Sequence, residues 1–158
     1  MLVSKQQYLQ LLCWPKTCFL PIIIANRYNR GMRKMGIDYG SKKTGLALTD
    51  ESGTMAFPHS VISTNSDLLK NIISLIEKEQ VGEVVIGYSL DRDGSPNKIH
   101  TAVEGLMLDL TLAIGLPIHL QPEQYTTQAA IRLQGKTKMT DAAAAALILD
   151  SYITSNKK

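Results

Sequence analysis

Apolar and polar positions follow two different periods after residue 33, and each change of period marks a predicted element. Short apolar runs bounded by glycine and polar turns are typical of strands, whereas apolar residues that recur every three or four positions are typical of helices. On this basis strands are expected over residues 34–38, 44–49, 56–63, 83–87 and 116–121. Helices are expected over residues 66–80, 97–114, 126–134 and 140–152.

The first two helices show the clearest amphipathic pattern. Ser66 and Asp67 are suitable N-cap residues for the first, and Gly115 is a suitable stop for the second. The apolar positions expected to face a core are Leu68, Leu69, Ile72, Ile73, Ile76, Val103, Leu106, Met107 and Leu110. The element order, three strands and then alternating helices and strands, predicts an α/β domain. Its mixed five-stranded sheet begins with three antiparallel strands and is covered by helices.

Residues 1–31 differ from the rest of the chain. They hold four basic residues and no acid, whereas the remaining 127 residues hold 13 basic and 14 acidic side chains. They also show no clean helical or strand period. We therefore expect residues 1–31 to be a poorly ordered extension, with Met32 as the natural start and residues 32–158 as one domain of ordinary size.

The N-terminal stretch suggests neither a metal site nor a membrane anchor. Cys13 and Cys18 have no partners at zinc-finger spacing, so we interpret them as two unrelated thiols. The apolar run over residues 18–25 contains Pro21 and is far shorter than the ~20 residues of a spanning helix. We expect no membrane association and a cytoplasmic location.

Three acidic residues stand where strands end or helices begin. Asp38 closes the first strand, Glu123 follows the fifth, and Asp141 opens the last helix. Each has an ordinary alternative role: a turn cap, an exposed loop acid, or an acid stabilised by the helix dipole. However, groups at the carboxyl ends of parallel strands collect at one edge of a sheet. We therefore hypothesise that the three acids converge on one or two Mg²⁺ or Mn²⁺ ions and catalyse phosphodiester hydrolysis.

The motifs around these acids resemble one family over nearly the whole chain from residue 32 to residue 153. Residues 36–50 (GIDYGSKKTGLALTD) closely resemble the opening of the YqgF/RuvX family, whose members are described as Holliday-junction resolvases and as pre-16S rRNA nucleases. Residues 84–90 with Asp93 and Gly94, Glu123 with Thr126, and residues 141–149 resemble its later segments. The resemblance implies an RNase H-like fold, with Asp38, Glu123 and Asp141 as metal ligands.

The sequence departs from the family pattern around the second acid. Pro122 and Gln124 stand where the family usually has Asp and Arg, and the connector before Asp141 is shorter than usual. The missing arginine would be a natural phosphate contact, so reduced activity or an altered substrate is a possible consequence. The remaining candidate nucleic-acid contacts are Lys42, Lys43, Arg92, Lys98, Thr126, Arg132, Lys136 and Lys138.

These observations favour a metal-dependent nuclease that processes the 5′ end of pre-16S rRNA. The alternatives are a Holliday-junction resolvase acting on branched DNA and a non-catalytic nucleic-acid-binding module. Residues 38–45 also resemble the first phosphate loop of sugar kinases, but those proteins need a second such domain, for which this chain is too short. The sequence leaves monomer and homodimer open.

Overall fold

The computed structural model describes residues 33–89, 98–122 and 139–156, which all belong to one compact unit, Gly31–Lys158. The predicted extension over residues 1–31 and the predicted helix over residues 126–134 lie outside the described residues, so both stay predictions. The described elements are β1 (Lys34–Tyr39), β2 (Lys43–Thr49), β3 (Ala56–Ser63), α2 (Leu68–Lys78), β4 (Glu83–Tyr88), α3 (Lys98–Ile114), β5 (Ile118–Pro122) and α5 (Thr140–Ser155).

The five strands form one mixed sheet in the order β3-β2-β1-β4-β5. The first three strands are antiparallel neighbours, with Asp38 opposite Gly45 in the pairing of β1 and β2. β4 lies parallel to β1 and to β5. The predicted five-stranded sheet with an antiparallel start is therefore confirmed. The carboxyl ends of β1, β4 and β5 share one edge of the sheet.

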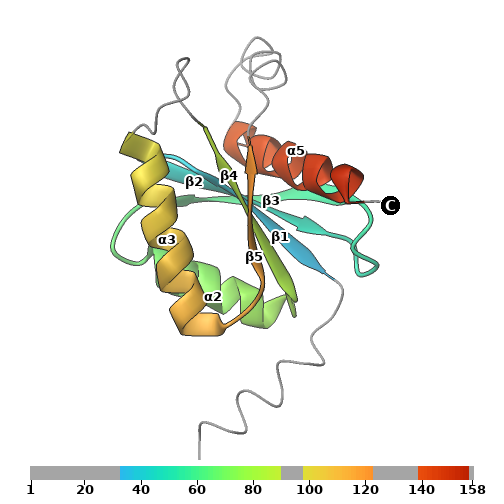
Figure 1. Ribbon diagram of the computed structural model, residues 1–158, viewed down its shortest axis with the longest axis horizontal. Helices are drawn as coiled ribbons and strands as arrows, with labels where there is room; N and C mark the ends of the chain where they lie inside the picture. The colour runs from blue at the N-terminus through green and yellow to red at the C-terminus, as the bar shows by residue number, and fades with distance from the viewer. Residues whose placement is uncertain (1–32, 90–97, 123–138, 157–158) are drawn as a thin grey trace, which may run out of the picture. The chain divides into compact units, whose positions relative to one another are not determined.

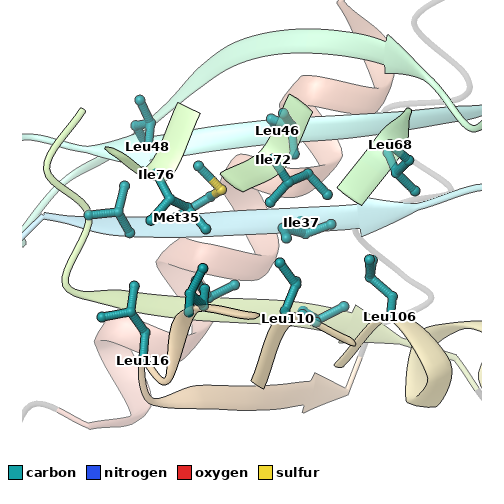
Figure 2. Packing of buried hydrophobic residues seen from close by; sticks show 14 of the residues in the cluster. Met35, Ile37, Leu46, Leu48, Leu68, Ile72, Ile76, Leu106, Leu110 and Leu116 are labelled. Carbon is teal, nitrogen blue, oxygen red and sulfur yellow. The ribbon is translucent and has the colours of Figure 1, made fainter. Parts of the chain in front are cut away.

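One face of the sheet carries the larger of two hydrophobic clusters. Successive strand residues point to opposite faces, so Met35 and Ile37 of β1 project to one side together with Leu46 of β2 and Ile86 of β4. Helices α2 and α3 cover this side, and Figure 2 shows their leucines and isoleucines packed against the strand residues. Leu68, Ile72, Ile76, Val103, Leu106 and Leu110 are buried as predicted, with Leu69, Ile73 and Met107 partly buried beside them.

The opposite face of the sheet is covered by α5 alone among the described helices (Figure 1). Its contact with the sheet is built from small residues: Ala145 and Ala146 pack with Ala47 and Val85 in the second cluster. Gly36 continues this close approach, because a Cβ placed on it would lie 2.7 Å from the Ala145 carbonyl oxygen. The alanine run that opens α5 thus packs tightly on the sheet.

The predicted N-cap of α2 and the predicted stop of α3 are both confirmed. Asp67 is the N-cap of α2, although its side chain makes no capping hydrogen bond. Its own N–H instead donates to Asn65 Oδ1 at 3.0 Å, and the Leu68 N–H donates to the Asn65 carbonyl at 3.0 Å. Gly115 has φ 58°, a left-handed conformation suited to glycine, and follows α3 as its predicted stop. Within the part of the chain that the structure describes, no helix is long and apolar enough to span a membrane.

Candidate functional site

Asp38 lies near the carboxyl end of the central strand, on the face of the sheet that α5 covers. It is two positions after Gly36, whose missing Cβ faces α5, so the two residues point the same way. The side chain is half-buried, and its cross-strand neighbour is Gly45. A carboxylate at this position is held on a rigid element and remains partly accessible from the edge of the sheet.

Gly45 brings the start of α5 to Asp38. A Cβ placed on Gly45 would lie 2.0 Å from the Asp141 carbonyl oxygen and 2.8 Å from the Ala142 nitrogen. The first turn of α5 therefore rests directly on the strand position that pairs with Asp38. The structure thus places the backbone of Asp141 beside the strand pair that carries Asp38, although the two residues are far apart in the sequence, and Asp141 is half-buried like Asp38.

The third acid, Glu123, lies outside the described residues, so its position stays a prediction. The residue before it, Pro122, ends β5 opposite Tyr88 of the parallel neighbour β4. Two strand spacings separate β5 from β1, about 10 Å in all. β5 therefore ends with Pro122 at the same sheet edge at which Asp38 lies.

The donor atoms at this edge suit a hard divalent cation. Carboxylate oxygens are the ligands that Mg²⁺ and Mn²⁺ prefer, and one or two of them suffice when phosphate and water complete the shell. Within residues 33–89, 98–122 and 139–156, no three metal-binding side chains lie together. Asp38 and Asp141 are two of the three predicted ligands, and Glu123, the predicted third, lies outside these ranges. The residues present fit the ion.

The candidate nucleic-acid contacts are only partly within the described residues. Lys42, in the turn after β1, and Lys43, the first residue of β2, are both exposed and closely follow the strand of Asp38. Lys98 is the first residue of α3, which begins at the same end of the sheet (Figure 1). The others, Arg92, Thr126, Arg132, Lys136 and Lys138, lie outside the described residues.

A polar cluster that the sequence does not reveal joins the far end of α5 to the sheet. Glu83 of β4 forms an ion pair with Lys34 of β1, accepts a 2.6 Å hydrogen bond from the Tyr152 hydroxyl, and lies 2.9 Å from His119 Nε2. The His119 and Tyr152 rings also contact each other, with centroids 5.1 Å apart. The cluster connects three strands to the C-terminal half of α5.

The cluster changes the acidity of two of its members. Burial acts most strongly on the pKa of Glu83 and raises it, but hydrogen bonds from Lys34 and Tyr152 and the charges of Lys34 and His119 outweigh burial, so the pKa is lowered. Burial and the bond to Glu83 both raise the pKa of Tyr152. The ion pair between Lys34 and Glu83 follows from the parallel register of β1 and β4, in which the two residues are partners. The sequence does not reveal this register, so it gives no signal for the cluster.

Comparison with known proteins gives the same family as the sequence motifs. A family model described as "RuvX: Holliday junction resolvase" matches residues 32–155. A Rickettsia felis protein named "Putative pre-16S rRNA nuclease" is 34% identical over 150 residues, covering 89% of this chain and 94% of the relative. A Maridesulfovibrio salexigens protein with the same name is 32% identical over 132 residues, covering 77% and 98%.

Solved structures support the fold. Thermus thermophilus RuvC in complex with a Holliday-junction substrate matches with a TM-score of 0.54 at 15% identity, covering 80% of this chain and 97% of that one. The fowlpox virus resolvase in complex with Holliday-junction DNA matches with a TM-score of 0.54 at 10% identity, covering 80% and 99%. Identities this low carry the fold alone, and the RNase H-like fold is therefore confirmed. With a family model that spans residues 32–155 and relatives about one-third identical over most of its length, the chain belongs to the RuvX family.

Proposed function

We propose that this protein is a metal-dependent nuclease that hydrolyses phosphodiester bonds at the sheet edge where Asp38 and Asp141 meet. One observation carries the proposal: Gly45 seats the first turn of α5 on the strand position that pairs with Asp38. Two carboxylates brought together would repel each other without a cation between them. Family membership and the relatives named as pre-16S rRNA nucleases support the same activity.

The chain contributes binding and positioning to this reaction. Asp38, Asp141 and Glu123 would hold one or two Mg²⁺ or Mn²⁺ ions, which when bound activate water and stabilise the departing oxygen. Asp38 is held by its pairing with Gly45 of β2, one residue after the pairing of β1 with β4 ends at Ile37, and Asp141 by the packing of α5 on two glycines. Lys42 and Lys43 would bind substrate phosphates beside this site.

We infer that the substrate is structured RNA, the 5′ segment of the 16S rRNA precursor, processed in the cytoplasm. The names of the relatives favour this substrate. The second candidate is branched DNA, which the description of the family model favours. The departures at Pro122 and Gln124 make a binding module without cleavage the third outcome that an experiment has to separate.

Cleavage of two labelled substrates tests these candidates together. We would incubate a 16S precursor 5′ segment and a four-way DNA junction with the protein and Mg²⁺ or Mn²⁺, using wild type, Asp38→Asn and Asp141→Asn. Asp109→Asn is the matched control, because Asp109 is exposed on α3. We expect metal-dependent cutting of the RNA by wild type and control, and loss in the other two variants with unchanged melting temperatures.

The opposite results are equally informative. Faster cutting of the junction than of the RNA would make the protein a resolvase. Salt-dependent binding of both substrates by all four proteins, without any metal-dependent cutting, would refute the nuclease and leave a binding module. Cutting by Asp38→Asn and Asp141→Asn at the wild-type rate would place the catalytic residues elsewhere.

A further inference from the structure

The turn between β1 and β2, residues 40–42, is tight and is stabilised by hydrogen bonds from a residue outside the turn. A Cβ on Gly40 would lie 2.5 Å from the Lys43 carbonyl oxygen, so the backbone at the two ends of the turn is too close to leave room for a side chain at position 40. Thr64, the residue after β3, donates its N–H to the Lys42 carbonyl at 3.0 Å. Its hydroxyl donates to the Gly40 carbonyl at 2.7 Å. One residue thus bonds to both ends of the turn.

The hydroxyl of Thr64 has a second partner, and its hydrogen count fixes the direction of that bond. Thr44 Oγ1 lies 2.8 Å from Thr64 Oγ1, and Thr44 is fully buried. A hydroxyl carries one hydrogen, and that of Thr64 is already donated to Gly40. Thr44 must therefore donate to Thr64. The result is a chain of two hydrogen bonds from a buried hydroxyl, through Thr64, to the turn.

We propose that Thr64 is a positioning residue for nucleic-acid binding: it fastens the turn so that Lys42 and Lys43 present their charges to phosphates beside Asp38. This inference rests on the nucleic-acid binding in the proposed function. A lysine is a point charge on a flexible stem, so where it binds is set by where its backbone is held. Phosphate contacts of this kind fix the register of the substrate relative to the catalytic groups.

Five variants of the full chain, one of them Thr64→Val combined with the lysine substitutions, separate positioning from a merely structural role. Thr64→Val removes the bond to Gly40 and leaves the buried Thr44 hydroxyl without an acceptor, whereas Thr64→Ser keeps both bonds. The double variant Thr44→Val/Thr64→Val removes the buried hydroxyl as well, so it regains the stability that Thr64→Val loses by leaving Thr44 unpaired, while the side-chain bond to Gly40 stays absent and only the backbone bond to Lys42 holds the turn. Lys42→Gln/Lys43→Gln removes the charges themselves.

The measurement is the affinity for the labelled 16S precursor segment without divalent metal, over a series of salt concentrations. The logarithm of affinity falls as the logarithm of salt concentration rises, and each lost phosphate contact should make this slope shallower by about 0.7 to 0.9. We expect the steepness of the slope to fall by about 1.5 for Lys42→Gln/Lys43→Gln. For Thr64→Val and for the double valine variant we expect it to fall by about half that amount or more. Thr64→Ser should bind as wild type, and adding Thr64→Val to the lysine variant should change the slope no further.

Several outcomes would overturn this inference. If Thr64→Val bound with the same salt slope as wild type, Thr64 would not position the lysines. If the double valine variant regained both its melting temperature and its binding, the role of Thr64 would be merely structural. If Lys42→Gln/Lys43→Gln bound with the affinity and salt dependence of wild type, the two lysines would make no phosphate contacts, and Thr64 would have nothing to position. Failure of the nuclease proposal looks different, because wild type would then bind with the full salt slope but cut neither substrate.

Discussion

A methyl group at Gly45 should disable the enzyme without unfolding it. The Cβ of Gly45→Ala would lie 2.0 Å from the Asp141 carbonyl oxygen and 2.2 Å from the carbonyl carbon, both backbone atoms that cannot rotate away. Carbon and carbonyl oxygen approach to about 3.3 Å at closest. The first turn of α5 would therefore move by roughly 1.3 Å, carrying Asp141 away from Asp38.

The displacement can be converted into expected effects on activity and stability. A misplacement of about 1 Å in a catalytic group can cost about 100-fold in rate, so we expect kcat/KM for the preferred substrate to fall about 100-fold. Forcing one extra methyl into packed structure costs about 1–3 kcal/mol of unfolding free energy. The assay is metal-dependent cleavage under the conditions of the Asp141→Asn test, with urea unfolding measured in parallel.

Two other glycines provide matched controls. A Cβ on Gly36 would lie 2.7 Å from the Ala145 carbonyl oxygen, one helical turn from the acids, so Gly36→Ala should destabilise but reduce activity less. A Cβ on Gly105, exposed in α3, would have nothing within 4 Å. Gly105→Ala should stabilise the protein by about 1 kcal/mol and leave cleavage unchanged. Wild-type cleavage and stability in Gly45→Ala would refute the seating of α5 on β2.

Three further predictions concern stability. Tyr152→Phe removes the hydroxyl bonded to Glu83 at 2.6 Å and should lower the unfolding free energy by about 1 kcal/mol in urea titrations. Because the folded pKa of Glu83 is lowered below 4.5, the unfolded chain binds more protons, and the stabilisation from Glu83 is present above pH 4.5 and lost as the pH falls below it. Glu83→Gln should therefore flatten the melting temperature against pH in that acid range, and an unchanged profile would contradict this reasoning. Leu110→Ala, at a fully buried position, should cost about 2–5 kcal/mol, whereas Leu112→Ala, at a position 78% exposed, should change stability by about 0.5 kcal/mol or less; similar losses in the two would contradict the packing of α3.

The sequence predicted the elements that depend on local pattern. The apolar period of α2 and α3 predicted their inward faces because burial on one side of a helix leaves a repeat of three and four positions. The strand runs, together with their order, predicted a mixed sheet with an antiparallel start. Asp38 could be placed at a strand end because a glycine-containing turn follows it closely.

Contacts between distant elements could not be predicted from the sequence. Gly36 and Gly45 stand inside strands, which is a known sign of close backbone approach, but the sequence does not say which element approaches. Pairing of Lys34 with Glu83 depends on the parallel register of β1 and β4, which local pattern leaves open. The sequence correctly placed Asp67 as the N-cap of α2, but it does not show that the Asp67 side chain makes no capping bond or that the Asp67 N–H donates to Asn65 Oδ1.

Because the first turn of α5 packs on β2, the candidate site is complete only after the last helix has been synthesised and has packed on the sheet. Asp38 belongs to the first strand to be synthesised and Asp141 to the last helix, 103 positions later, so closing the site is a long-range folding event. A nascent chain that has emerged only as far as β5 contains the sheet and the binding turn but only one member of the acid pair. Under the proposed function, such an intermediate would bind nucleic acid without cutting it, and cleavage would begin only once the C-terminal helix has docked.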